Sequence, residues 1–223
     1  MRYVRDQALG LFFGAIFLLA LVGQALTGVA QYNADRASSG LDEISLLDYL
    51  GSSSFAVDVA ENWQSEYLQF LLYIWVTVWL IQRGSPESKE PGEGGVGTDE
   101  EQKVGAYATS SSPAWARARG WRLRLYSSSL VAVMGAIFLL SWLAQSIAGR
   151  SAYNETQLDD LQDPVSWAGY LATSEFWNRT FQNWQSEFLA VGSMIVFSIY
   201  LRQRGSPQSK PVGEPHSSTG VEG

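Results

Sequence analysis

The 223-residue chain contains no cysteine and a single histidine, His216, close to its C-terminal end. Without cysteine it can form no disulfide, thiolate nucleophile, iron–sulfur cluster or cysteine-bound zinc site. A single histidine also removes imidazole-based triads and paired-histidine haem sites. Serine, aspartate and glutamate remain as candidate catalytic side chains, but no pair of carboxylates occurs within the long apolar runs described below. The composition therefore predicts a protein that is not an enzyme and holds no metal or cofactor.

Positive charge is also scarce. The chain carries 15 basic and 22 acidic residues, a formal net charge of −7. Nucleic-acid binding relies on lysine and arginine to neutralise phosphates. The acidic balance therefore argues against a nucleic-acid partner.

Four apolar runs stand out between polar and acidic stretches. Leu9–Thr27 and Tyr126–Ala148 are free of acidic and basic residues, and each is about as long as a bilayer-spanning helix. Tyr67–Ile81 and Phe188–Leu201 are shorter, but each reaches about 17–20 residues if its flanking polar turn enters the headgroup region. A soluble bundle is the alternative, although the long runs are apolar on every face, which soluble helices rarely are. We expect an all-α integral membrane protein with four transmembrane helices.

The basic residues predict the orientation of these spans. Twelve of the fifteen fall before the first span, between the second and third, or after the fourth, and they include Arg2 and Arg5. Only Arg36, Arg150 and Arg179 lie in the other two loops. By the positive-inside rule both termini are cytoplasmic. A cleaved signal peptide ending near Ala30 is the alternative, but the matching segment in mid-chain cannot be one.

The two halves of the chain are an internal duplication. Residues 1–90 align without a gap with 122–211 at a constant offset of 121, and about a third of the aligned positions are identical. Each half contains two predicted spans, so both copies have the same orientation and form parallel repeats. The sequence thus predicts a first hairpin (1–90), a disordered cytoplasmic linker (91–121), a second hairpin (122–211) and a disordered tail (212–223).

The end of the linker is basic and aromatic. Four arginines alternate there with tryptophan and leucine: Arg117, Arg119, Arg122 and Arg124. Such a segment can lie on an anionic leaflet, at about 1 kcal/mol per basic residue. The simpler interpretation is that it anchors the following span on the cytoplasmic side. Both interpretations make the lipid bilayer a partner.

The outer loops contain signals for further helices. Asp42 and Asp163 stand where an N-cap residue would open a short interfacial helix. Second helix starts follow at Ser53 and Ser174, and each predicts a long helix that continues into the second or fourth span. We expect an ordered, acidic layer on the outer face.

One group of polar residues is predicted near the outer margin of the membrane, in pairs related by the duplication. They are Gln24, Asn62, Glu66, Gln145, Asn183 and Glu187. Helix rise places the glutamine and the glutamate of each hairpin at similar depth. They could form a site for a proton, a cation or a polar ligand. Alternatively, their side chains form hydrogen bonds between helices, and each such bond contributes about 0.6 kcal/mol.

The paired NWQSE segments (62–66 and 183–187) and RGSP-x-SK segments (83–89 and 204–210), with VGQALTG at 22–28, resemble a family of uncharacterised bacterial membrane proteins. The resemblance spans both repeats and implies a bacterial inner-membrane location, but it implies no activity or ligand. We expect a scaffold or accessory subunit that binds another envelope protein or a second copy of itself. The alternative is a small proton or cation transporter that uses Glu66 and Glu187.

Overall fold

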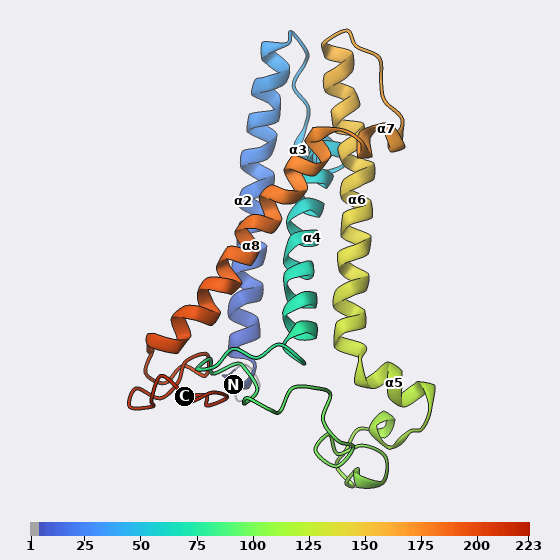
Figure 1. The fold of residues 1–223 in the computed structure, drawn as a ribbon. Helices are drawn as coiled ribbons and strands as arrows, with labels where there is room; N and C mark the ends of the chain where they lie inside the picture. Colours follow the sequence, from blue (N-terminus) through green and yellow to red (C-terminus); the bar gives the residue numbers. More distant parts are fainter. Residues whose placement is uncertain (1–4) are drawn as a thin grey trace. The chain divides into compact units, whose positions relative to one another are not determined.

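The computed structural model describes residues 5–223 (Figure 1), so that Arg2 lies outside the described residues. Within this range every regular element is a helix and none is a strand, which confirms the all-α prediction. Contacts divide the chain into two units, one made of residues up to 60 together with 143–176, the other of 61–142 together with 177–223. The division crosses the long helices, so each unit contains parts of both repeats.

The two longest helices are α2 (Ala8–Ser38) and α6 (Ser129–Asp159). Among the described residues they are the two that are long and apolar enough to cross a membrane. Their apolar side chains are widely exposed: Leu9 of α2 is 74 % exposed and Leu140 of α6 is 66 % exposed. Length and composition thus support two of the four predicted spans.

Helices α4 (Ser53–Val76) and α8 (Ser174–Tyr200) begin at the predicted serines and run without interruption. The predicted second span extends to Ile81, but α4 ends five residues earlier. Val76, Thr77 and Val78 are β-branched, which disfavours helix, and the Thr77 hydroxyl donates to the Tyr73 carbonyl. The chain leaves the helix in tight turns from this point.

Two short helices, α3 (Leu46–Leu50) and α7 (Trp167–Leu171), cover the loops that follow α2 and α6. The predicted caps, Asp42 and Asp163, were wrong. The N-caps are Ser45, whose side chain accepts from the Asp48 amide, and Ser166, which accepts from Gly169. The serines are themselves related by the offset of 121, so the two copies cap their short helices in the same way.

The segment between the repeats contains only short helices: two 3-10 turns (Gly105–Tyr107 and Ala114–Arg117) and α5 (Trp121–Ser127). Gly120, at φ +64°, separates the second 3-10 turn from α5. The basic stretch is therefore two short pieces rather than one amphipathic helix. The predicted limits of linker and tail stay predictions.

Candidate functional site

The predicted polar residues do not form one buried cluster. Gln145 on α6 is buried, and Gln24, Asn183 and Glu187 are half-buried. Asn62 and Glu66 are exposed on α4. Glu66 and Glu187 nevertheless lie close enough for their charges to interact. The two glutamates thus lie within range of each other's charge.

The polar side chains that α4 does bury are Gln64 and Ser65. They belong to the buried stripe of the helix, together with Val57 and Leu68, because residues three and four apart share a helix face. Gln64 was not among the candidate residues predicted from the sequence. The apolar residues Val57 and Leu68, seven positions before and four positions after Gln64, were the sequence signal that Gln64 lies on the buried face.

Helix α8 binds this face of α4 through two polar contacts. The Trp184 indole donates to Gln64 Oε1 at 2.8 Å, and Arg179 pairs with Glu61 at 2.6 Å. Trp63, the counterpart of Trp184, is exposed. The duplicated NWQSE segments therefore make an asymmetric contact, in which the glutamine comes from one copy and the tryptophan from the other.

Each outer loop is fastened by an asparagine. The Asn33 side chain donates to the Ile44 carbonyl and accepts from its amide, both at 2.9 Å. Asn154 makes the same pair of bonds to Val165, at 3.0 and 2.8 Å. Two hydrogen bonds to one backbone residue fix where the loop returns along the helix. Asn33 and Asn154 are related by the offset of 121, so both copies attach the loop in the same way.

A tyrosine from each short helix lies against a glycine of the preceding long helix. A Cβ atom on Gly28 would lie 2.9 Å from Tyr49 Cζ, and one on Gly149 would lie 3.0 Å from Tyr170 Cζ. Both tyrosines are buried. Burial, assisted by the Asp58 carboxylate, raises the pKa of Tyr49 and keeps its hydroxyl neutral. The repeated glycines and tyrosines are one packing device used twice.

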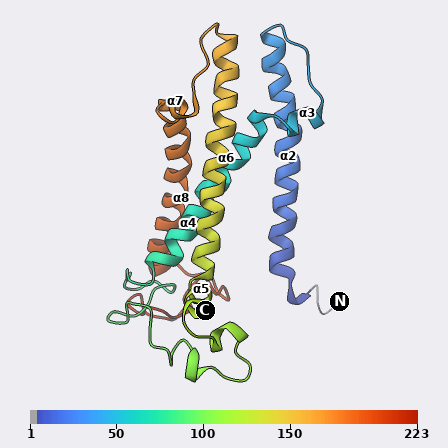
Figure 2. The same ribbon diagram turned by 90° about the vertical axis from the view of Figure 1, so that its right-hand side faces the viewer.

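The outer ends of α2 and α6 are joined directly. The Tyr32 hydroxyl donates to Glu155 Oε1 at 2.6 Å. Both residues lie near the C-terminal ends of their helices, and Figures 1 and 2 show α2 and the last half of α6 running in the same direction. The two helices are therefore parallel neighbours in the first unit.

Both long helices end in the same turn, but with different residues at its critical position. Gly40 (φ +72°) and Leu161 (φ +58°) occupy the left-handed position after α2 and α6. The following amides donate back to Arg36 and Gln157. Glycine is the usual residue there. Leu161 takes the strained conformation although its side chain is 94 % exposed.

The first unit is strongly acidic around the C-terminal ends of α2 and α6. Its exposed carboxylates lie in the last turns of these helices and in the segments that follow them, and Leu158 and Leu161 are exposed in the same part of the chain. The carboxylates are those of Asp35, Asp42, Glu43, Asp48, Asp159, Asp160 and Asp163. We call these acids, with the two leucines, the acidic outer face.

The two RGSP-x-SK segments form matching turns after the C-terminal ends of α4 and α8. Gly84 and Gly205 have positive φ, and Ser88 and Ser209 each accept a hydrogen bond from the glutamine amide six residues earlier. The glycines permit a backbone conformation that other residues resist. The repeated motif therefore ends each helix in a defined turn.

The C-terminal tail packs on the first of these turns. The ammonium nitrogen of the buried Lys210 lies 2.7–3.2 Å from four carbonyl oxygens, those of Gly84, Pro215, His216 and Ser218, which share its three N–H groups. The Gly84 amide donates to the Thr219 hydroxyl at 2.9 Å. The tail of the second repeat thus holds the turn of the first.

The four predicted linker arginines are all exposed. Arg117 donates to the carbonyls of Ser110 and Ser112, both at 2.7 Å, so it holds its own loop. Arg122 lies over the Trp121 ring. No group of three metal-ligating side chains occurs within residues 5–223.

Comparison with known proteins gives a family without a known activity. No curated protein and no solved structure matches the chain. A family model described as a domain of unknown function, DUF6766, matches residues 1–221 and so covers both repeats, the linker and nearly all of the tail. The predicted membership of an uncharacterised family is confirmed, and the chain belongs to the DUF6766 family.

Proposed function

We propose that the protein crosses a bacterial inner membrane four times, with both termini in the cytoplasm. The parallel pairing of α2 and α6, joined by Tyr32 and Glu155, carries this proposal. If two parallel helices both span a bilayer, the chain between them crosses it an odd number of times. Among the described residues, α4 is the long helix in that interval.

The duplication extends the same argument to α8. It returns the chain to the side on which it began, and twelve of the fifteen basic residues then lie on that side. The positive-inside rule makes this side the cytoplasm. The acidic outer face is then presented outside the membrane.

We further propose that the protein is a non-catalytic scaffold or accessory subunit whose acidic outer face binds another envelope protein. Asn33 and Asn154 fasten the loops of this face, and the buried Tyr49 and Tyr170 support them. An ordered surface loses less conformational entropy on binding than a flexible one. Its charge favours a partner with a basic rim, and the exposed Leu161 supplies an apolar contact. A second copy would bring like charges together, so this face fits a different protein.

Site-specific photocrosslinking in native membranes tests this proposal. A photoreactive amino acid at position 161 should capture a second membrane-associated protein, whereas one at Leu140 should capture lipid. Changing Asp159, Asp160 and Asp163 to asparagine together should reduce the position-161 adduct several-fold, because it removes the charge complementarity. Adducts at position 161 with lipid or with the chain itself, and with no other protein, would contradict the proposal.

Proton or cation transport is a second candidate, favoured by the interacting charges of Glu66 and Glu187. Ionisable groups in membrane segments mark ion pathways in many proteins. Flux into proteoliposomes should then be abolished by the double change Glu66→Gln/Glu187→Gln and retained by Glu43→Gln, a loop control. A folded, correctly inserted wild type without flux would remove this candidate.

A further inference from the structure

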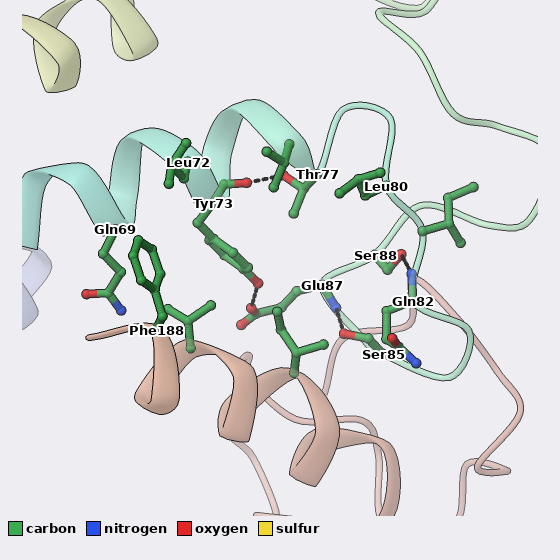
Figure 3. Close-up of a pocket in the computed structure, with 14 residues that line it drawn as sticks. Gln69, Leu72, Tyr73, Thr77, Leu80, Gln82, Ser85, Glu87, Ser88 and Phe188 are labelled. Carbon is green, nitrogen blue, oxygen red and sulfur yellow. Dashed lines mark hydrogen bonds between the residues drawn. The ribbon is translucent and has the colours of Figure 1, made fainter. Parts of the chain in front are cut away.

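A cavity of about 600 Å³ lies between the C-terminal part of α4 and the middle of α8, within the second unit (Figure 3). Its size is within the range of pockets for small ligands. One wall follows a helical stripe through Leu72 and Val76, and the facing wall contains Val191 and Ile195. Hydrocarbon side chains on both sides make the body of this cavity apolar.

Polar groups gather at one end of the cavity, where the first RGSP turn closes it. The Tyr73 hydroxyl donates to one oxygen of the Glu87 carboxylate. The other oxygen accepts no hydrogen bond from the described residues. The hydroxyl oxygens of Ser85 and Ser88 already accept hydrogen bonds from the backbone amides of Glu87 and Gln82, respectively. Glu87 is therefore the charged group available to a ligand at this end.

An acidic recess lies on the other side of Glu87. This recess shares Glu87 and Ser88 with the apolar cavity and is also lined by Glu90, Glu93 and Glu222. Lys89 is its one basic lining residue, and the Lys89 ammonium donates to the Gly95 carbonyl. Glu87 thus lines both an apolar cavity and a recess that contains three further carboxylates.

We propose that this cavity binds an amphiphile with a hydrocarbon body and a single positively charged nitrogen headgroup. The body occupies the space between α4 and α8, and the headgroup lies at Glu87, facing the acidic recess. Such a molecule can be an amine-headed lipid of the inner leaflet or a free lipophilic amine. The proposal rests on the membrane location proposed above.

The internal duplication supplies a comparison, because the second repeat lacks these polar groups. Met194, Gln208 and Ala190 stand where the first repeat has Tyr73, Glu87 and Gln69. Gln208 nevertheless occupies the same turn, since its amide donates to Ser206 as that of Glu87 donates to Ser85. Glu87→Gln therefore removes the charge and keeps a turn sequence that this chain already folds.

The test uses two photoreactive probes with the same 16-carbon chain, one ending in trimethylammonium and the other in sulfate. The full-length protein is placed in nanodiscs of phosphatidylglycerol, a lipid without a nitrogen headgroup, then labelled and mapped by peptide mass spectrometry. The cationic probe should label residues 69–80 and 188–195 more than the sulfate probe does, relative to labelling of α2. Glu87→Gln should reduce this preference about 10-fold, since the electrostatic attraction between the carboxylate and the positive headgroup is lost. Gln208→Glu should leave it unchanged.

Two further arms sharpen the result. Val76→Trp, which fills the cavity, should abolish the cationic preference. Competition by added phosphatidylethanolamine identifies a lipid source, and competition by dodecylamine alone identifies a free amine. Equal labelling by both probes, an unchanged preference in Glu87→Gln, or no competition by either amine would overturn the proposal. Absence of labelling on α2 and α6 would instead contradict the membrane location.

Discussion

At the residue scale, Gly28 and Gly149 occupy positions where a side chain would collide with a tyrosine. Each lies in a long helix where alanine would normally be the better helix former by about 1 kcal/mol. Each is also covered by a buried tyrosine ring, which leaves no room for a methyl group. Packing therefore opposes intrinsic propensity at these two positions.

We expect Gly149→Ala to lower the free energy of unfolding by about 1–3 kcal/mol, because the new methyl group displaces Tyr170. Gly23→Ala is the matched control, since no atom lies within 4 Å of the added Cβ, and it should be neutral or slightly stabilising. Thermal unfolding in detergent measures both changes. Equal effects at the two sites would show that the tyrosine does not restrict position 149.

Leu161 is strained for a different reason. A left-handed backbone costs a residue with a Cβ atom about 1–2 kcal/mol, and an almost fully exposed leucine gains little from burial. Strain that persists without a structural benefit is a sign of function. Leu161→Gly should therefore raise the free energy of unfolding by about 1 kcal/mol. It should also reduce photocrosslinking of the partner protein to the acidic outer face. Gly40→Leu, the reciprocal change, should lower stability by a similar amount. A destabilised Leu161→Gly variant would contradict this explanation.

At the scale of elements, repeated motifs predicted more than single residues did. The starts of α4 and α8 followed from Ser53 and Ser174, and the repeated RGSP-x-SK segments proved to form matching turns after these helices. The caps of α3 and α7 were missed because aspartate and serine have similar N-cap preferences. Local sequence does not distinguish two such residues three positions apart; the path of the loop does.

The polar residues of α4 show a second limit of prediction from sequence. Counting residues from the membrane boundary gives depth along a helix, but it does not give the rotation of the helix about its axis. That rotation is set by packing against α8, which selects Gln64 for burial and leaves Glu66 exposed. The contact between Lys210 and the first RGSP turn could not be predicted from the sequence either, since it joins residues 126 positions apart.

This tail contact leads to a prediction about the first RGSP turn. Lys210→Ala removes four charge-assisted contacts, and it should destabilise this region by about 2 kcal/mol. Hydrogen exchange should become faster in residues 82–88 and 211–220. Lys89→Ala is the matched control, because its ammonium donates to the carbonyl of Gly95 alone among the described residues, and it should have a smaller effect. Unchanged exchange in Lys210→Ala would show that the tail does not hold the turn.

At the scale of the whole molecule, the central claim concerns how many times the chain crosses the membrane. Two crossings, by α2 and α6 alone, would place the linker outside and the α6–α7 loop inside. Four crossings place them the other way round. The native chain has no cysteine, so single cysteines can be introduced without any background.

The most direct measurement is labelling of Ser111→Cys and Gln162→Cys in intact cells with a membrane-impermeant maleimide. Both residues are exposed, so accessibility depends on the side of the membrane on which they lie. The account predicts that Gln162→Cys is labelled from outside and that Ser111→Cys is labelled only after the cells are opened. Labelling of Ser111→Cys in intact cells, with Gln162→Cys protected, would contradict it.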